Sequence, residues 1–351
     1  MTLTYSAVKL ERELQRTGRG RASAAARQLE AMFDVLVAGD GELAILHALQ
    51  PNAPKLLDGD DHKGPLFMSD AIYDASPSAI ASFGRSCELS LQYRGSSRDK
   101  PDRAIRLSVQ LWLLRRPQLE ELTRHSFEII VNEMESIYKA YGYTGFMFYD
   151  DELNVSKSMV DLMNAISDLQ HRLGVEFRLR GFVKAELFNE TQAAAMYRAG
   201  FRWLLCGFEA ANPRILENIQ KRASLEDNSR AVEIAKKHGL KVKALMSIGH
   251  PGESEQSALD VRNWLIKMEI DDFDCTIITT YPGTPYYDYA IPHDSHANVW
   301  TYTQPQTGDR LHAYDIDFTT TPDYYKGDPD GGYRAYVFTD YLTSSEILSI
   351  A

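Results

Sequence analysis

The sequence predicts an α/β protein whose centre is a partial parallel barrel of the (β/α)6, TIM-like type. Between residues 144 and 282, five segments with the pattern of strands alternate with four segments that have the 3.6-residue period of helices. Polar residues gather where these strands should end, and in parallel α/β folds the carboxyl ends of the strands form the active face. A further strand upstream would complete a set of six.

Short apolar runs bounded by turn residues predict the strands. They are residues 144–151, 176–184, 202–210, 241–249 and 272–282. Helical periodicity, mostly with a Ser or Asn cap before it or a Gly after it, predicts the helices. These are residues 156–174, 189–200, 225–239 and 254–268. The alternation predicts right-handed crossovers with the helices on the outside of the sheet.

The two ends of the chain are less regular. Residues 33–49 have the pattern of a strand, a tight turn and a helix, and they resemble the closing segment of a cobalamin-binding, Rossmann-like domain. Asp60 and His62 match two positions of that domain's DxHxxG signature, but Gly64 comes one residue early and the motif follows the segment it should precede. For residues 291–351 we expect irregular structure over the barrel mouth, or alternatively a partly ordered extension.

Bulk composition excludes several classes of protein. A net charge of −11 and a pI near 5.4 argue against a nucleic-acid-binding surface over the whole protein. No apolar run is long enough to span a bilayer, and the first residues lack the apolar core of a signal peptide. The three cysteines are widely spaced and form no disulfide framework, so we expect a cytoplasmic location.

Five polar groups lie in register at the predicted strand ends, which favours a site over chance capping. They are Asp150, Asp151 and Glu152; Lys184 and Glu186; Glu209; Ser247, His250 and Glu253; and Thr279, Thr280 and Tyr281.

Four blocks in this region, in this order and spacing, resemble the radical S-adenosylmethionine (radical SAM) enzymes, especially their cobalamin-associated branch. The blocks are FMFYDDELN (146–154), RAGFRWLLCGFEAANPRIL (198–216), GLKVKALMSIGHPGES (239–254) and TTYPGTPYYD (279–288). The resemblance divides the chain into a truncated cobalamin-binding-like remnant with a linker (1–75), an aberrant segment where the first strand and cluster loop belong (76–125), the barrel core (126–290) and a C-terminal extension (291–351).

The resemblance implies a role for each candidate residue. Asp150, Asp151 and Glu152 would face the ammonium group of S-adenosylmethionine, although acidic residues also suit a helix N-terminus. Arg180 would pair with the methionine carboxylate if it points inward, and otherwise lies at a solvated strand edge. Glu209 would contact the ribose or the substrate. The last contact, along the adenine edge, would come from the main chain of three residues: Ser247, Ile248 and Gly249.

The resemblance also implies cofactors and partners. Enzymes of this family hold a 4Fe-4S cluster that reduces S-adenosylmethionine to methionine and a 5′-deoxyadenosyl radical, with electrons from a donor such as flavodoxin or ferredoxin. Cobalamin would make methyl transfer the expected reaction, but the N-terminal fragment supports it weakly. The substrate is not indicated by the sequence.

The cysteines that should bind the cluster are missing. The family spaces them CxxxCxxC, but this region offers only Cys87, with Leu91 and Arg94 at the matching offsets. Neither leucine nor arginine can replace a thiolate ligand. As written, the chain provides no metal ligands, and we expect it to be inactive as a radical SAM enzyme.

A shifted reading frame would restore these cysteines. The stretch LSVQLWLLRRPQLEE (107–121) permits codons that, read one nucleotide later, encode Cys-Pro-Phe-Asn-Cys-Gly-Phe-Cys-Gly-Gly-Arg-Asn-Ser-Lys. The cysteines fall at Leu107, Leu111 and Leu114, with CxxxCxxC spacing. We therefore hypothesise that two compensating frame changes bracket roughly Ser82 to Leu122. The alternative is a genuine, diverged segment from a family member that lost its cluster.

Two other functions stay open from the sequence. The polypeptide could be a cluster-less protein that binds S-adenosylmethionine or a relative for regulation. An unrelated barrel hydrolase could instead use Asp150, Asp151, His250 and Glu253 around a divalent metal, but their spacing fits no metal motif, so this reading ranks last.

Overall fold

The computed structural model describes residues 21, 31, 33–38, 41–58, 104–105, 120–148, 152–281, 284–317 and 334–351. The chain divides into two compact units, one formed by residues 1–100 with 280–289 and the other by residues 101–279 with 290–351. In the first unit, β1 (Leu36–Ala38) pairs in parallel with β2 (Leu56–Asp58), and α3 (Gly41–Ala48) connects them. This is the predicted order of strand, turn and helix; the comparison with a cobalamin-binding domain stays a prediction. The same unit contains α12 (Pro285–Asp288).

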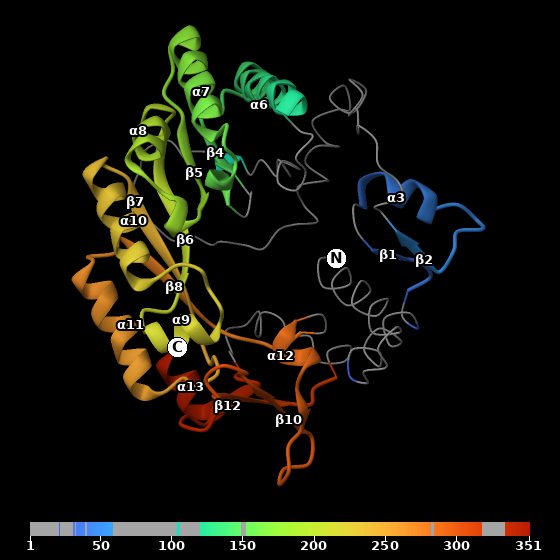
Figure 1. Cartoon of the computed structure of the whole chain (residues 1–351). Coiled ribbons are helices and arrows are strands. Elements are labelled where there is room, and N and C mark those ends of the chain that lie inside the picture. The colour runs from blue at the N-terminus through green and yellow to red at the C-terminus, as the bar shows by residue number, and fades with distance from the viewer. Residues whose placement is uncertain are drawn as a thin grey trace, which may run out of the picture. The chain divides into compact units, whose positions relative to one another are not determined.

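The second unit is built on a six-stranded parallel sheet in sequential order. Its strands are β3 (Ala104–Ile105), β4 (Gly145–Phe148), β5 (Arg178–Val183), β6 (Phe201–Glu209), β7 (Lys241–Ile248) and β8 (Asp272–Ile277). Figure 1 shows the longer helices of this unit along one side of the sheet. They are α6 (Glu120–Tyr141), α7 (Met159–Leu173), α8 (Glu190–Arg198), α10 (Leu225–Lys237) and α11 (Glu255–Lys267). The predicted α/β class and partial barrel are therefore confirmed.

Local signals explain where these helices begin and end. Asn189 caps α8 through a reciprocal capping box with Gln192, and Ser224 and Ser254 do the same for α10 and α11. Gly174 ends α7 in the left-handed conformation that glycine adopts without steric cost. The short α9 (Pro213–Asn218) and the 3-10 turns η2 (Leu153–Val155) and η3 (Ala185–Leu187) follow strand ends and were not predicted.

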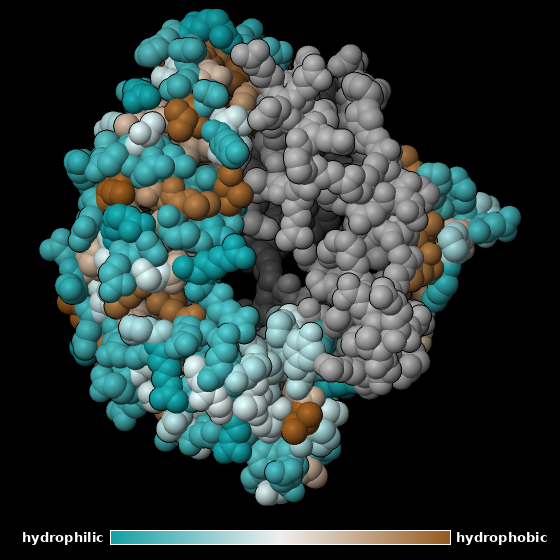
Figure 2. Space-filling view, in the orientation of Figure 1, coloured by the Kyte–Doolittle hydropathy of each residue, from teal (hydrophilic) through white to brown (hydrophobic). Residues whose placement is uncertain are grey.

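The core lies between the sheet and these helices. Phe177, Phe201 and Phe208 are fully buried there, and each stabilises the fold by roughly 2–3 kcal/mol through burial. Because side chains alternate along a strand, the residues between the core positions point to the opposite face of the sheet. On the helical side, Figure 2 shows mostly hydrophilic residues with small, separate apolar groups.

The C-terminal extension is more regular than predicted. Its described residues form an antiparallel sheet in the order β12-β11-β10-β9, followed by α13. The elements are β9 (Ile291–Pro292), β10 (Val299–Thr303), β11 (Arg310–Tyr314), β12 (Val337–Thr339) and α13 (Ser344–Ile350). The expectation of irregular structure is wrong for these residues, because β10 and β11 pair along their whole length and bury most of their side chains. None of the helices that the structure describes is long and apolar enough to cross a membrane.

Candidate site at the strand ends

The carboxyl ends of β4 to β7 bring two polar clusters to one edge of the sheet. Of the acidic group after β4, Asp150 and Asp151 lie outside the described residues. Glu152 is described, and its Oε2 lies 3.2 Å from Nζ of Lys184 at the end of β5. Two of the predicted strand-end groups are thus joined by an ion pair.

Lys184 is the centre of the first cluster. Its Nζ also lies 3.5 Å from Oε1 of Glu186, and its main chain is fixed by Asn154. The buried amide of Asn154 donates to the Lys184 carbonyl (2.9 Å) and accepts from the Lys184 N–H (2.7 Å). Burial opposes the charge, but the hydrogen bond and ion pair with Glu152, and those with Glu186, outweigh it and raise the pKa of Lys184. The ammonium group therefore stays charged.

Arg180 does not share this position. It is exposed, its Nε donates to Sδ of Met147 (3.1 Å), and it lies four residues before Lys184 on the same strand. At the rise of a β-strand, that places its Cα about 13 Å below the strand end. The predicted contact between Arg180 and a carboxylate at the active face stays a prediction, and Lys184 is the better placed cation.

Glu209 is the centre of the second cluster, at the end of β6. Its φ of 65° is rare for a residue with a side chain, and the register with β7 shifts between Gly207 and Glu209. Such a bulge re-aims the side chain at a strand end. Oε2 of Glu209 accepts a hydrogen bond from the Ser247 hydroxyl (2.7 Å), and Oε1 lies 3.6 Å from Nζ of Lys221.

His250 extends this cluster into the interior. Its Nε2 lies 2.8 Å from Oγ of Ser247. Because that hydroxyl donates its proton to Glu209, Nε2 of His250 carries the hydrogen and donates to Oγ. Complete burial, with a smaller effect from Lys221, lowers the pKa of His250 to about 3. The imidazole is thus neutral at physiological pH and serves as a donor that orients Ser247.

The loop after β7 is held by its own chain. Buried Glu253 accepts a hydrogen bond from the Gly249 N–H (3.3 Å), and the Ile248 carbonyl accepts one from the Ile278 N–H (2.9 Å). A Cβ on Gly249 would lie 3.0 Å from Val337, and one on Gly252 would lie 2.6 Å from Asp309. Both residues also have a positive φ, 100° and 80°, so backbone conformation and close packing against the C-terminal extension together account for the two glycines. The predicted adenine contact of Ser247, Ile248 and Gly249 stays a prediction.

Asn218 connects this loop to the extension. Its buried amide donates to the Pro251 carbonyl (2.7 Å) and to Oδ2 of Asp309 (2.7 Å). The same amide accepts a hydrogen bond from the Thr307 hydroxyl (2.6 Å). Arg214 forms a bidentate pair with Asp309. Although burial opposes ionisation, the hydrogen bonds from Arg214 and Asn218 lower the pKa of Asp309. The extension is therefore anchored to the loop that follows Ser247.

The described residues provide no site for an iron–sulfur cluster. Cys206 is buried on the core face of β6, and burial raises its pKa to about 12. Cys275 packs against the same core, and burial raises its pKa to about 11. Neither forms a thiolate under ordinary conditions. No group of three or more His, Cys, Asp or Glu in the described part of the chain could hold a metal. Leu107, Leu111 and Leu114 lie outside the described residues.

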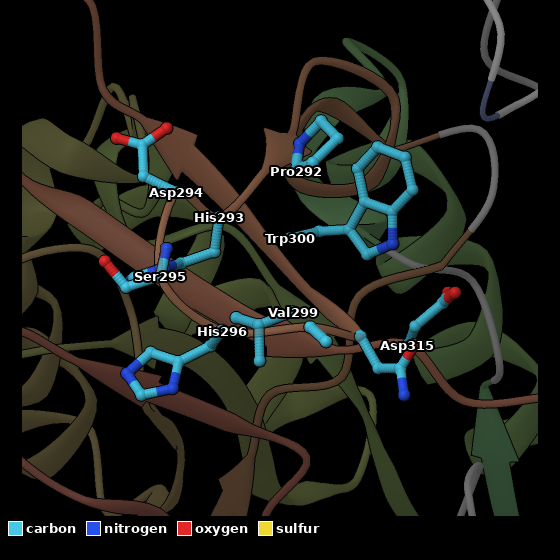
Figure 3. A pocket seen from close by; sticks show the side chains of 10 residues that line it. Pro292, His293, Asp294, Ser295, His296, Val299, Trp300 and Asp315 are labelled. Carbon is cyan, nitrogen blue, oxygen red and sulfur yellow. The ribbon is translucent and has the colours of Figure 1, made fainter.

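A separate pocket of about 420 Å³ lies in the C-terminal sheet, around the connection from β9 to β10. Figure 3 shows Trp300 and Asp315 on one side of it and His296 with Ser295 on the other. The ring of His293 lies 4.8 Å from that of His296 and 5.1 Å from that of buried His312. Because the Ser295 N–H donates to Nδ1 of His293 (3.0 Å), this imidazole has a structural role in the loop.

Sequence reasoning missed Lys221 and Asn218. Asn218 is the last residue of α9 and Lys221 follows it by three residues, and no periodic pattern reveals this helix of six residues. The one available signal was the Asn-Pro pair at 212–213, a helix start that Asn212 caps through hydrogen bonds from the Arg214 and Ile215 N–H groups.

Comparison with known proteins finds a family model that matches the central part of the chain. Residues 114–265 match the model of the radical SAM superfamily. The match begins at the last of the three positions where a shifted frame would place cysteine. The chain is also 32% identical to an uncharacterised methyltransferase of Pyrococcus horikoshii over 171 residues, which are 48% of this chain and 36% of the relative. It is also 24% identical to the bacteriochlorophyllide d C-12(1)-methyltransferase of Chlorobaculum tepidum over 165 residues, 46% of this chain and 35% of the relative.

Solved structures give a weaker likeness. The radical S-adenosylmethionine methyltransferase TsrM from Kitasatospora setae, in complex with tryptophan and an S-adenosylmethionine analogue, superposes with a TM-score of 0.46 and 16% identity. The superposition covers 64% of this chain and 46% of TsrM. The matched region spans only about a third of the curated relatives' length.

Proposed function

Because residues 114–265 form a domain of the radical SAM superfamily, we propose that this chain binds S-adenosylmethionine at the carboxyl ends of β4 to β7. The observation that carries the proposal is the pair of clusters at these strand ends, Glu152 with Lys184 and Glu209 with Ser247. The cluster of Glu152 and Lys184 offers a carboxylate and an ammonium group to a zwitterionic amino acid. The cluster of Glu209 and Ser247 offers a half-exposed carboxylate to neutral hydroxyls.

These groups fit the two ends of the ligand. Glu152, with Asp150 and Asp151 before it, would accept from the ligand's ammonium group, and Lys184 would pair with its carboxylate. This assignment replaces Arg180 by Lys184, because Lys184 lies at the strand end and stays charged. Glu209 would accept hydrogen bonds from the ribose hydroxyls, and the main chain from Ser247 to Gly249 would line the adenine. When bound, S-adenosylmethionine supplies a sulfonium that activates its methyl and adenosyl groups.

The 4Fe-4S cluster of the family does not fit this chain. The two described cysteines are protonated core residues, and Cys87 alone cannot hold a cluster. We infer that the intact lineage carries the three cysteines and that this polypeptide, with residues from about Ser82 to Leu122 in a shifted frame, has lost them. It is then inactive in radical chemistry while keeping the ligand site.

Methyl transfer is the reaction that we propose for the intact lineage, with an electron donor such as flavodoxin or ferredoxin. The names of the relatives from Pyrococcus and Chlorobaculum support it, since one is an uncharacterised methyltransferase and the other a bacteriochlorophyllide d C-12(1)-methyltransferase. Cobalamin as the methyl carrier is a further proposal.

A cluster-less binding or regulatory protein is the second candidate. It is favoured by the fact that ion pairs and hydrogen bonds within the chain already hold the described ligand groups in place. A barrel hydrolase is disfavoured because His250 and Glu253 are both buried and both serve the loop after β7.

Calorimetry with S-adenosylhomocysteine tests the proposal, because this analogue keeps the adenosyl and amino-acid groups and needs no cluster chemistry. We expect saturable binding by the unchanged chain, and loss of at least tenfold in affinity in a Glu209→Ala variant. Lys243→Met provides a control. Lys243, like Lys184, pairs with two carboxylates, but it lies near the start of β7 and away from the strand ends. Absence of binding by the unchanged chain would reject the proposal.

A further inference from the structure

Lys221 is brought back to β6 by the way α9 ends. Gln220 has a φ of 55°, and the Lys221 N–H donates to the Leu216 carbonyl (3.1 Å) while the Gln220 N–H donates to the Glu217 carbonyl (2.9 Å). These two bonds form a Schellman turn, in which a left-handed residue reverses the chain after a helix. The turn returns Lys221 to the strand that the chain left at Glu209.

Lys221 contacts the strand end at two places. Its Nζ donates to the Gly207 carbonyl and lies 3.6 Å from Oε1 of Glu209. A Cβ on Gly207 would lie 3.0 Å from that same Oε1. A larger residue at position 207 would therefore crowd the Glu209 carboxylate, so Gly207 leaves room for it to fold back over the strand toward Lys221.

The other carboxylate oxygen is held by a different partner. Oε2 of Glu209 accepts from Ser247, which in turn accepts from buried His250. Both oxygens of Glu209 thus have a partner within the chain, Lys221 for one and Ser247 for the other. The Glu209 side chain nevertheless keeps 37% of its surface exposed, so the carboxylate is fixed in direction but still accessible.

Lys221 also affects the protonation of His250. Its side chain is 21% exposed, and its positive charge contributes, after burial, to the low pKa of His250. Glu209 is held against this cation with a φ of 65°, a backbone conformation that is strained for a residue with a side chain. Such strain persists where the surroundings fix the residue, and here Lys221 and Ser247 are the groups that do so.

We propose that Lys221 is a positioning residue that aims the Glu209 carboxylate at the ribose hydroxyls of the adenosyl ligand. This inference rests on the proposed function and adds to it a residue that touches no ligand itself. It predicts that loss of Lys221 weakens only the part of the affinity that comes from the ribose hydroxyls.

The test compares two probes, S-adenosylhomocysteine and its 2′,3′-dideoxy analogue, on the full 351-residue chain. Hydrogen bonds from the ribose hydroxyls to a charged carboxylate should make the unchanged chain prefer the first probe by about tenfold or more. In Lys221→Met we expect this preference to fall to about twofold, with the affinity for the dideoxy analogue unchanged. Lys221→Arg, which keeps the charge and the donors, should restore the preference.

Lys243→Met is the matched control. Lys243 has a similar side-chain exposure, 24%, and lies 2.9 Å from both Asp272 and Asp274 on the same sheet. This variant should keep the full preference. If Lys221→Met does not fold, as judged by its thermal midpoint, Lys221→Gln replaces it, because a glutamine amide can still donate to the Gly207 carbonyl.

The outcomes separate the two claims. A tenfold preference that survives in Lys221→Met or Lys221→Gln overturns the positioning role while leaving the proposed function intact. An unchanged chain that binds neither probe overturns both. A preference lost equally in the Lys221 and Lys243 variants also overturns the inference, since the effect would then be a general response to the loss of a lysine.

Discussion

The Ser247 hydroxyl donates a hydrogen bond of 2.7 Å to Oε2 of Glu209. This bond joins the end of β7 to the end of β6, where Glu209 has a φ of 65°. A left-handed residue at the end of a strand is unusual, because a side chain there clashes with its own backbone. The bond lies at the edge of the sheet where parallel α/β proteins carry their chemistry. The predictions below depend on this strained, doubly held carboxylate and its neighbours.

The strained backbone at Glu209 should lower the stability of the folded chain, while its carboxylate serves the ligand site. Glycine adopts a positive φ without steric cost, whereas alanine keeps the strain and lacks the carboxylate. A Glu209→Gly variant should therefore be more stable than Glu209→Ala by about 1 kcal/mol. Urea unfolding of the two variants measures this difference directly, and both should lose affinity for S-adenosylhomocysteine. Equal stability of the two variants would mean that the backbone at this position is not strained.

His250 should make stability depend on pH. Its pKa is lowered from 6.5 to about 3 in the folded chain, so between these values the unfolded chain binds a proton that the folded chain does not. Stability rises with pH wherever the unfolded state binds more protons, so the free energy of unfolding should fall as the pH drops from about 6.5 to about 4. The pKa of Asp309 is lowered from 3.8, so this carboxyl reduces the free energy of unfolding mainly at still lower pH.

A His250→Gln variant isolates this effect, since the amide can still donate to Ser247. Its unfolding free energy should fall less steeply than that of the unchanged chain over the same pH range. Buried His312, whose pKa burial also lowers, is present in both proteins and cancels in the comparison. Parallel curves for the two proteins would contradict a neutral, buried imidazole at position 250.

Asn218 should be a major contributor to the docking of the C-terminal extension. An Asn218→Ala variant leaves the Pro251 carbonyl and the Thr307 hydroxyl without their buried partner. We expect a loss of about 2–4 kcal/mol in the free energy of unfolding. Asn164→Ala on the exposed face of α7 serves as the control and should change it by no more than about 0.5 kcal/mol. A loss below 1 kcal/mol for Asn218→Ala would show that the extension is anchored elsewhere.

Lys184 should discriminate between ligands with and without a carboxylate. In Lys184→Met, the affinity for S-adenosylhomocysteine should fall about tenfold, because a charge-assisted hydrogen bond is lost. The affinity for 5′-methylthioadenosine, which has no amino-acid group, should stay the same. If Arg180→Met gives this selective loss and Lys184→Met does not, the original assignment of the carboxylate to Arg180 is restored.

Local sequence signals predicted much of the fold, but not the contacts that shape the site. The capping box at Asn189 and the glycine stop at Gly174 placed two helices within a few residues of their observed ends. Helix α6 (Glu120–Tyr141) was missed beside the aberrant segment, although its apolar positions recur with helical period. The antiparallel strands of the C-terminal extension were missed because their tyrosines and threonines were interpreted as irregular structure.

The candidate site was only partly predictable for a physical reason. Glu209 and Ser247 were found because parallel strands must end at the same edge of the sheet. Lys221 was not found from the sequence. Its contact with Gly207 depends on a Schellman turn in which Gln220 occupies the left-handed position where glycine is usual. The burial that keeps His250 neutral depends on packing that one segment of sequence does not specify.

The nucleotide sequence of the gene across the codons for Ser82 to Leu122 tests the central claim most directly. We predict that the frame read one nucleotide later is free of stop codons and encodes cysteine across the codons of Leu107, Leu111 and Leu114, with one frame change on each side. The natural protein would then carry the cluster ligands of a radical SAM enzyme, and this chain would be its inactive form. Stop codons in that frame, or the absence of the three cysteine codons, would contradict the claim and make the cluster-less binding protein the leading account.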